Sequence, residues 1–154
     1  MKLCFKNITI FIGEDFTNHD ELNLIIENNL DQIALLYPEE HTNKKHESSK
    51  LNTLIILDGT WRKTFKIFSL SSNLHTLPRV SFKENFESLY RIRNSTKRNS
   101  LSTLEATNLA LKEIEPLLET GALNHLFIKM INFQIEKMGD EIFHKNYSKK
   151  KGSD

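Results

Sequence analysis

The amino-acid sequence predicts a single α/β domain whose mostly parallel sheet is flanked by helices. The chain has 154 residues, a length that suits one domain with a proper hydrophobic core. Two short, continuous apolar runs, residues 32–37 and 53–57, are typical of strands buried on both faces. Segments with helical periodicity lie between the strand candidates, which favours parallel strands joined by crossover helices.

The first part of the chain predicts a strand, a helix and a second strand in that order. Residues 7–13 have the pattern of a short strand, residues 19–30 that of an amphipathic helix, and Pro38 stops the buried strand 32–37. Residues 38–50 have no periodicity and are expected to form a loop. The side chains spaced for one face of the helix are Leu22, Ile25, Ile26 and Leu30.

After the strand 53–57, the sequence offers either a hairpin or a helix. Asp58 and Gly59 between apolar runs are a hairpin signal, but strict alternation fails in the residues that follow. We therefore expect a helix that Thr60 caps, with Asp58 where a buried strand meets the helix N-terminus. The helical spacing i, i+3, i+4, i+7 is that of Trp61, Thr64, Phe65 and Phe68.

The second half predicts one more strand and two helices. Residues 78–82 are a short strand candidate, and a basic, irregular stretch follows. The next helix begins near residue 102; Pro116 is expected to kink or end it and Gly121 to stop it. Its expected face consists of Leu104, Thr107, Leu111, Ile114 and Leu118.

A closing helix is expected over residues 124–139, and these complete a domain that spans residues 1–139. Residues 140–154 form a basic tail that we expect to be disordered. The side chains placed on one side of the closing helix are Leu126, Phe127, Met130, Ile131 and Gln134.

Composition excludes several classes of protein. No apolar run approaches the roughly 20 residues that cross a bilayer, and the amino terminus lacks the apolar core of a signal peptide, so a cytoplasmic protein is expected. A single cysteine, Cys4, allows neither an internal disulfide nor a Cys-rich zinc site, and the six histidines are scattered. We therefore expect no metal.

Positive charge gathers in the middle of the chain. Between residues 59 and 101, nine lysines and arginines accompany two glutamates, although the net charge of the whole chain is only +1. Such a segment is either a phosphate-binding face or a solvated surface whose charges happen to cluster.

Three groups of residues are candidates for a site. Asp58 to Trp61 follow a strand, where ligands bind in open α/β sheets; Gly59 allows close approach, and Trp61 either stacks on a base or fills the core. Ser102, Thr103 and Glu105 form either a capping box or a helix N-terminus that binds an anion. Tyr90, Arg91 and Arg93 either hold unstacked RNA bases or alternate along an edge strand.

An ordered set of motifs, spanning roughly residues 13–136, resembles the DTW-domain family, whose name letters correspond to Asp58, Thr60 and Trp61. The motifs are "GEDF" (13–16), "LLYP" (35–38), "LDGTWRK" (57–63), "LPRVSF" (77–82), "YRIR" (90–93), "LSTLEA" (101–106) and "FIKMINFQIE" (127–136).

The resemblance implies a tRNA-uridine aminocarboxypropyltransferase related to the SPOUT methyltransferase-like proteins. Such enzymes transfer the 3-amino-3-carboxypropyl group of S-adenosyl-L-methionine to N3 of a tRNA uridine, giving 3-(3-amino-3-carboxypropyl)uridine. The family likeness also implies a deep trefoil knot, one of the rare exceptions to unknotted topology. Because the donor is already activated, the chain mainly has to present the correct carbon and help remove the uracil imide proton.

The resemblance also assigns roles to the candidates. Asp58 is the expected base or orienting acceptor. The residues expected to line the donor pocket are Gly59, Thr60, Trp61, Ser102, Thr103 and Glu105. The residues expected to face tRNA are Arg62, Lys63, Tyr90, Arg91 and Arg93.

One departure from the family pattern concerns the amino terminus. Bacterial relatives usually begin with a Cys-rich zinc-binding segment before the "GEDF" region, whereas this sequence starts close to that region, so we expect a shortened member, a fragment or a degenerate copy. The rival hypotheses are a methyltransferase that uses the same donor and an RNA- or partner-binding module without catalysis.

Overall fold

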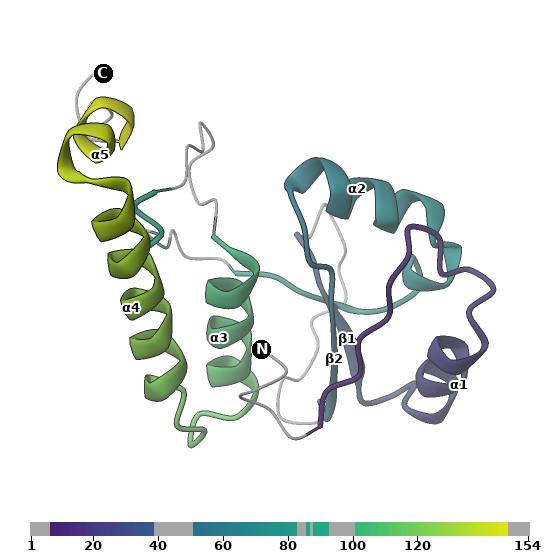
Figure 1. Cartoon of the computed structure of the whole chain (residues 1–154). Helices are drawn as coiled ribbons and strands as arrows, with labels where there is room; N and C mark the ends of the chain where they lie inside the picture. Colours follow the sequence, from purple (N-terminus) through teal and green to yellow (C-terminus); the bar gives the residue numbers. More distant parts are fainter. Residues whose placement is uncertain (1–6, 39–50, 83–85, 87, 93–100, 148–154) are drawn as a thin grey trace.

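The computed structural model of the chain describes residues 7–38, 51–82, 86, 88–92 and 101–147 (Figure 1). All of the described strands lie among its first 80 residues together with α1 and α2, and the described elements after them are helices. The elements in chain order are α1 Asp20–Asn28, β1 Ile33–Leu36, β2 Thr53–Ile56, α2 Trp61–Leu70, the 3₁₀ turn η2 Ser72–Leu74, β3 Arg79–Val80, α3 Thr103–Ile114, α4 Gly121–Met138 and α5 Asp140–Tyr147.

The three strands form a parallel sheet in the order β2-β1-β3. Ile33 of β1 is paired with Thr53 of β2, and Leu35 of β1 with Arg79 of β3. Ile33, Ala34 and Leu35 are fully buried because β1 is the central strand. The structure therefore confirms the predicted α/β fold with parallel strands. The SPOUT relationship and the trefoil knot stay predictions.

Side chains of β1 alternate between two layers of core. Ile33 and Leu35 pack in a cluster with residues of α1 and η2, against which α2 also packs, whereas Ala34 packs with Val80 and with Ala110 of α3. Helices α1 and α2 thus cover one face of the sheet and α3 covers the other, while α4 packs outside α3 (Figure 1). Because the three strands are parallel, their carboxyl ends all lie on the same side of the sheet. This side is called the carboxyl edge below.

The predicted strand at residues 7–13 is wrong for this structure. The segment pairs with no strand among the described residues, and Ile12 is almost completely exposed. Its contacts are made by side chains instead, since the Phe11 ring lies 4.6 Å from the His19 ring and packs on the core below α1. High β-propensity made the segment extended, but a strand also needs a partner edge.

The chain after this segment is tied to the end of α2. The Phe16 amide donates to the buried Ser71 Oγ over 3.0 Å, and Thr17 Oγ1 donates to the Leu70 carbonyl over 3.0 Å. The Thr17 amide donates to Asp15 Oδ1 and holds the pKa of that carboxyl below its usual value. The bonds to Ser71 and Leu70 tie this segment to the carboxyl-terminal end of α2.

The second half agrees with expectation at the end of α3 and differs from it at Gly121 and in the buried face of α4. α3 ends at Ile114, two residues before Pro116, so the expectation that Pro116 ends or kinks the helix is confirmed in its first form. Gly121 does not stop a helix but is the first residue of α4. The stripe that α4 buries consists of Leu123, Phe127 and Ile131, whereas the expected Leu126 and Met130 are exposed.

The prediction of a disordered tail from residue 140 is wrong for residues 140–147, which form α5. Acidic residues in its first turn and basic ones in its last favour a helix through the macrodipole, and the Phe143 and Tyr147 rings stack at 5.9 Å. The remainder of the expected tail lies outside the described residues, and the domain boundary at residue 139 stays a prediction.

None of the helices described has the length and apolar content needed to span a bilayer.

Candidate active site

The junction of β2 and α2 places Asp58 at the carboxyl edge. Asp58 comes two residues after the last residue of β2 and two before the cap of α2, and its side chain is exposed. Within the described part of the chain, no group donates a hydrogen bond to its carboxylate. The carboxylate is therefore available to a ligand and is not tied up in capping the helix.

Gly59 and Thr60 build the turn that presents Asp58. Thr60 has extended backbone angles, and its Oγ1 accepts from the Lys63 amide over 3.4 Å, which confirms the predicted N-cap. Gly59 has φ +155°, and a Cβ there would lie 3.2 Å from Lys63 Cβ. Glycine is thus required by the turn itself, because both its backbone angle and the available space exclude a side chain.

We predict that Gly59→Ala lowers the free energy of unfolding by about 1–3 kcal/mol, since alanine would be strained at this φ and crowd Lys63. Urea unfolding followed by circular dichroism measures the change. Gly121→Ala is the matched control, because a Cβ at Gly121 meets no atom within 4 Å and should leave stability unchanged or slightly higher. Equal losses in both variants would contradict this role for Gly59.

Helix α2 turns a different face to the core than its spacing suggested. Thr64 is buried and Phe68 packs on the core, but Trp61 is 39% and Phe65 is 63% exposed. The periodicity correctly predicted a helix. Which face of the helix is buried depends on how the helix packs against the sheet. Trp61 therefore stands at the start of α2 with its ring partly in solvent rather than in the core.

The amino terminus of α3 has the predicted capping box. Ser102 Oγ accepts from the Glu105 amide over 3.2 Å, and Glu105 Oε2 accepts from the Ser102 amide over 2.8 Å. In Figure 1 this end of α3 lies on the same side of the molecule as the carboxyl edge. Thr103, the first residue of α3, is half-buried.

Glu105 also holds a loop that is distant in sequence. Its carboxylate accepts from Ser88 Oγ over 3.0 and 3.1 Å and from the Leu89 amide over 2.6 Å, in addition to the bonds with Ser102. The side chain is only 6% exposed. A buried carboxylate with this many donors fixes the position of residues 88–90 relative to α3.

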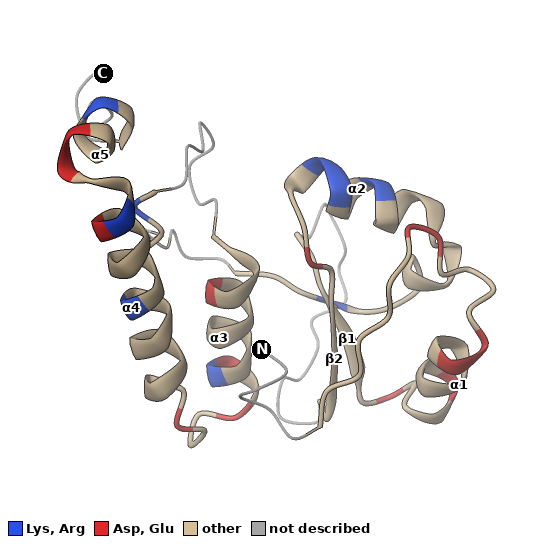
Figure 2. Cartoon of the chain, in the orientation of Figure 1, with Lys and Arg blue, Asp and Glu red and all other residues tan. Residues whose placement is uncertain are grey.

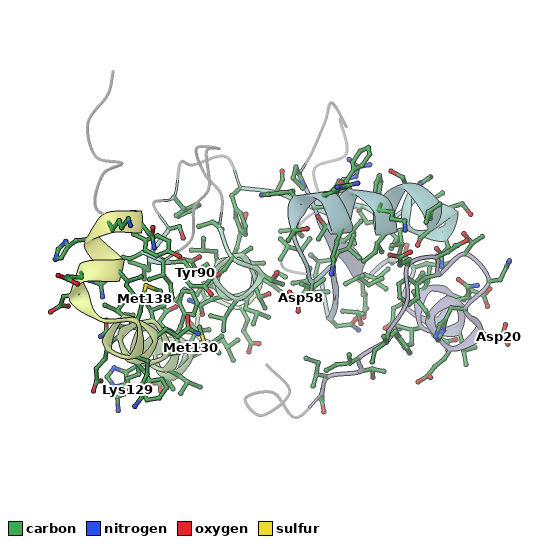
Figure 3. The ribbon with its side chains drawn as sticks, turned by 45° about the horizontal axis from the view of Figure 1, so that its top comes forward. Asp20, Asp58, Tyr90, Lys129, Met130 and Met138 are labelled. Carbon is green, nitrogen blue, oxygen red and sulfur yellow. The ribbon has the colours of Figure 1, made fainter. Side chains whose placement is uncertain are left out.

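Tyr90 and Arg91 are held on the far side of α3, against α4. The Tyr90 ring meets the Phe127 ring edge to face at 5.4 Å, and an Arg91 Nη2 donates to Asn132 Oδ1 over 2.5 Å. In Figure 3 Tyr90 lies toward α4, whereas Asp58 lies toward α2. The structure therefore does not bring Tyr90 together with Asp58. Arg93 lies outside the described residues.

Two residues with contacts near these candidates, Ser88 and Arg79, were not identified from the sequence. Ser88 has no local pattern that points to Glu105, 17 positions away. Arg79 lies in β3, and its guanidinium stacks over the Phe68 ring at 4.7 Å and donates to the Pro38 carbonyl over 3.2 Å. A cation inside an otherwise apolar strand was a signal that could have identified Arg79.

The described residues contain no group of three His, Cys, Asp or Glu side chains arranged to hold a metal ion. The expectation that no metal is involved stays a prediction.

Comparisons with known proteins agree with the motifs at these positions. The DTW domain matches residues 1–135, which include β1, β2, α2, β3 and α3 and most of α4. A curated Drosophila melanogaster protein named tRNA-uridine aminocarboxypropyltransferase 2 is 32% identical over 149 residues; the alignment covers 89% of this chain and 59% of that protein. No solved structure matches the chain. The chain belongs to the DTW-domain family.

Proposed function

We propose that the chain modifies tRNA by transferring the 3-amino-3-carboxypropyl group of S-adenosyl-L-methionine to N3 of a uridine. The family and the name of the Drosophila relative support this activity, although the chain spans about three fifths of that relative's length. The observation that carries the proposal is the carboxylate of the family's namesake motif, which is exposed at the carboxyl edge and accepts no hydrogen bond from the residues that the structure describes. In parallel α/β sheets, ligands bind at this edge.

In the proposed reaction, a bond forms between uracil N3 and the terminal carbon of the aminocarboxypropyl chain as the bond from that carbon to sulfur breaks. The donor supplies a sulfonium leaving group, which departs as methylthioadenosine. Asp58 accepts the imide proton of the uracil, directly or through one water, and orients the ring. An unpaired carboxylate suits this task because no competing donor has to be displaced first.

The donor is proposed to lie between the start of α2 and the start of α3. Gly59, Thr60, Trp61 and Thr103 are the residues proposed to contact it. Ser102 and Glu105 bond to one another, and Glu105 also accepts from Ser88 and Leu89, so both residues are proposed to support this wall of the site instead of touching the donor. The carboxylate of Glu105 also makes this helix terminus unfavourable for a second anion.

The tRNA is proposed to contact cations on two elements. Arg62 and Lys63 are exposed on the first turn of α2, and Arg91 is exposed beside α4. Figure 2 shows the positive residues of α2 together along the upper part of this helix. Tyr90 and Arg93 complete the proposed tRNA-facing set. The reaction is proposed to take place in the cytoplasm.

We predict that the purified chain, given S-adenosyl-L-methionine and unmodified tRNA, produces 3-(3-amino-3-carboxypropyl)uridine. Nucleoside mass spectrometry of the digested tRNA identifies the product. A methylated uridine would instead favour the methyltransferase hypothesis. If calorimetry detects no binding of the donor while tRNA still binds, the enzyme proposal is refuted and a non-catalytic RNA-binding module remains.

A further inference from the structure

The outward surface of α2 carries an aromatic row next to a basic row. Trp61 and Phe65 are one turn apart on the exposed side of the helix, at 39% and 63% exposure. Arg62 and Lys66 occupy the neighbouring row, because successive helical residues are about 100° apart. The helix has three cations and no acidic residue, so its surface attracts anions (Figure 2).

The exposed Phe65 ring has no part in holding α2 on the sheet. That contact is made by the opposite side of the helix, through Thr64, Ile67 and Phe68. Two exposed rings one turn apart, flanked by cations, form a surface that suits a ligand with both an apolar face and negative charge. The partner must therefore offer an apolar face and negative charge together.

We propose that this surface binds an unpaired nucleotide of RNA, with its base stacked on Phe65 and its phosphates near Arg62 and Lys63. Every base has a π-face that stacks on an aromatic ring, and flanking cations neutralise the backbone. Paired bases bury their faces in the helix, so the proposed ligand is a single-stranded loop or end. Lys66 Nζ forms a salt bridge with Glu14 Oε2 over 2.5 Å. The phosphates are therefore proposed to contact Arg62 and Lys63 in the first turn instead of Lys66.

The position of Phe65 relates this surface to the proposed reaction. Side chains at i and i+4 of a helix are about 6 Å apart, so a base on Phe65 would lie next to Trp61, the first residue of α2 after the Asp58 turn. The nucleotide held here is the neighbour of the target uridine. This inference rests on the proposed function, to which it adds the class of RNA and the residue that selects it.

The test compares two RNA probes by fluorescence anisotropy with the full chain. One is a hairpin with a uridine-containing single-stranded loop, and the other is a fully paired duplex of equal length. Phe65→Ala should weaken binding to the hairpin about 5- to 100-fold, as expected for the loss of one stacked base, and leave binding to the duplex unchanged. Phe65→Tyr, which keeps the ring, should bind the hairpin like the original chain.

Leu70→Ala is the matched control, because Leu70 is also an exposed apolar residue of α2 (45%) but lies on another side of the helix. It should leave hairpin affinity unchanged. Unchanged hairpin affinity in Phe65→Ala would overturn the inference. If the unaltered chain still transferred the aminocarboxypropyl group, the proposed function would not be affected by that result.

Two other outcomes also overturn the inference. Absence of RNA binding by the unaltered chain would remove the proposed function as well. A change from dimer to monomer in sedimentation of Phe65→Ala, with hairpin affinity unchanged, would assign the surface to self-association.

Discussion

Asp58→Asn is expected to slow transfer of the aminocarboxypropyl group by a factor of about 10²–10⁴ while tRNA affinity stays the same. The carboxamide has the same shape as the carboxylate but cannot accept the imide proton, and general-base assistance of this kind typically contributes that range. Stability should change by less than about 0.5 kcal/mol, because Asp58 is exposed and receives no hydrogen bond within the described part of the chain. Single-turnover transfer with labelled donor measures the rate, and filter binding measures the affinity.

The control for this substitution is Asp20→Asn, which removes an exposed carboxylate at the start of α1, far from Asp58 in Figure 3. It should leave both rate and affinity unchanged. A parallel fall of rate and tRNA affinity in Asp58→Asn would show that Asp58 acts in binding, and an unchanged rate would remove it from the chemistry.

Local sequence signals predicted the elements that frame the site. Thr60 and Ser102 were identified as caps because capping depends on residues within three positions of one another, and both bonds are present. The run 32–37 was identified as a buried strand because a central parallel strand is apolar on both faces. The residues of the DTW motif follow β2 at the carboxyl edge, where the site is proposed to lie.

Features that depend on distant contacts were not predictable in the same way. Phe65 and Phe68 have equally apolar side chains, and only the docking of α2 on β1 decides which of them faces solvent. Residues 7–13 have strand propensity, but pairing depends on whether an edge of the sheet is within reach. The partner of Glu105 in the loop at Ser88 follows from the tertiary fold and not from any spacing.

Glu105→Ala is expected to lower the free energy of unfolding by about 3–5 kcal/mol, because three donors lose their shared acceptor and each such loss costs about 1–3 kcal/mol when the donor is closed to water. The substitution leaves the Ser88 hydroxyl, the Leu89 amide and the Ser102 amide without this acceptor; the Ser102 amide is buried, and the other two bonds are partly buried. It also removes half of the capping box. Urea unfolding measures the loss, and hydrogen exchange should show weaker protection at the Leu89 and Ser102 amides.

Two further variants separate the two tasks of Glu105. Ser88→Ala removes the hydroxyl bonds to Glu105 and to the Tyr90 amide but keeps the Leu89 bond, and it should cost about 1–2 kcal/mol with the start of α3 unchanged. Glu113→Ala, at an exposed position of the same helix, should cost less than about 0.5 kcal/mol. If Glu105→Ala were no more damaging than Glu113→Ala, the carboxylate would not be what joins residues 88–90 to α3, and the position of Tyr90 would have to depend on the contacts of Tyr90 and Arg91 with α4.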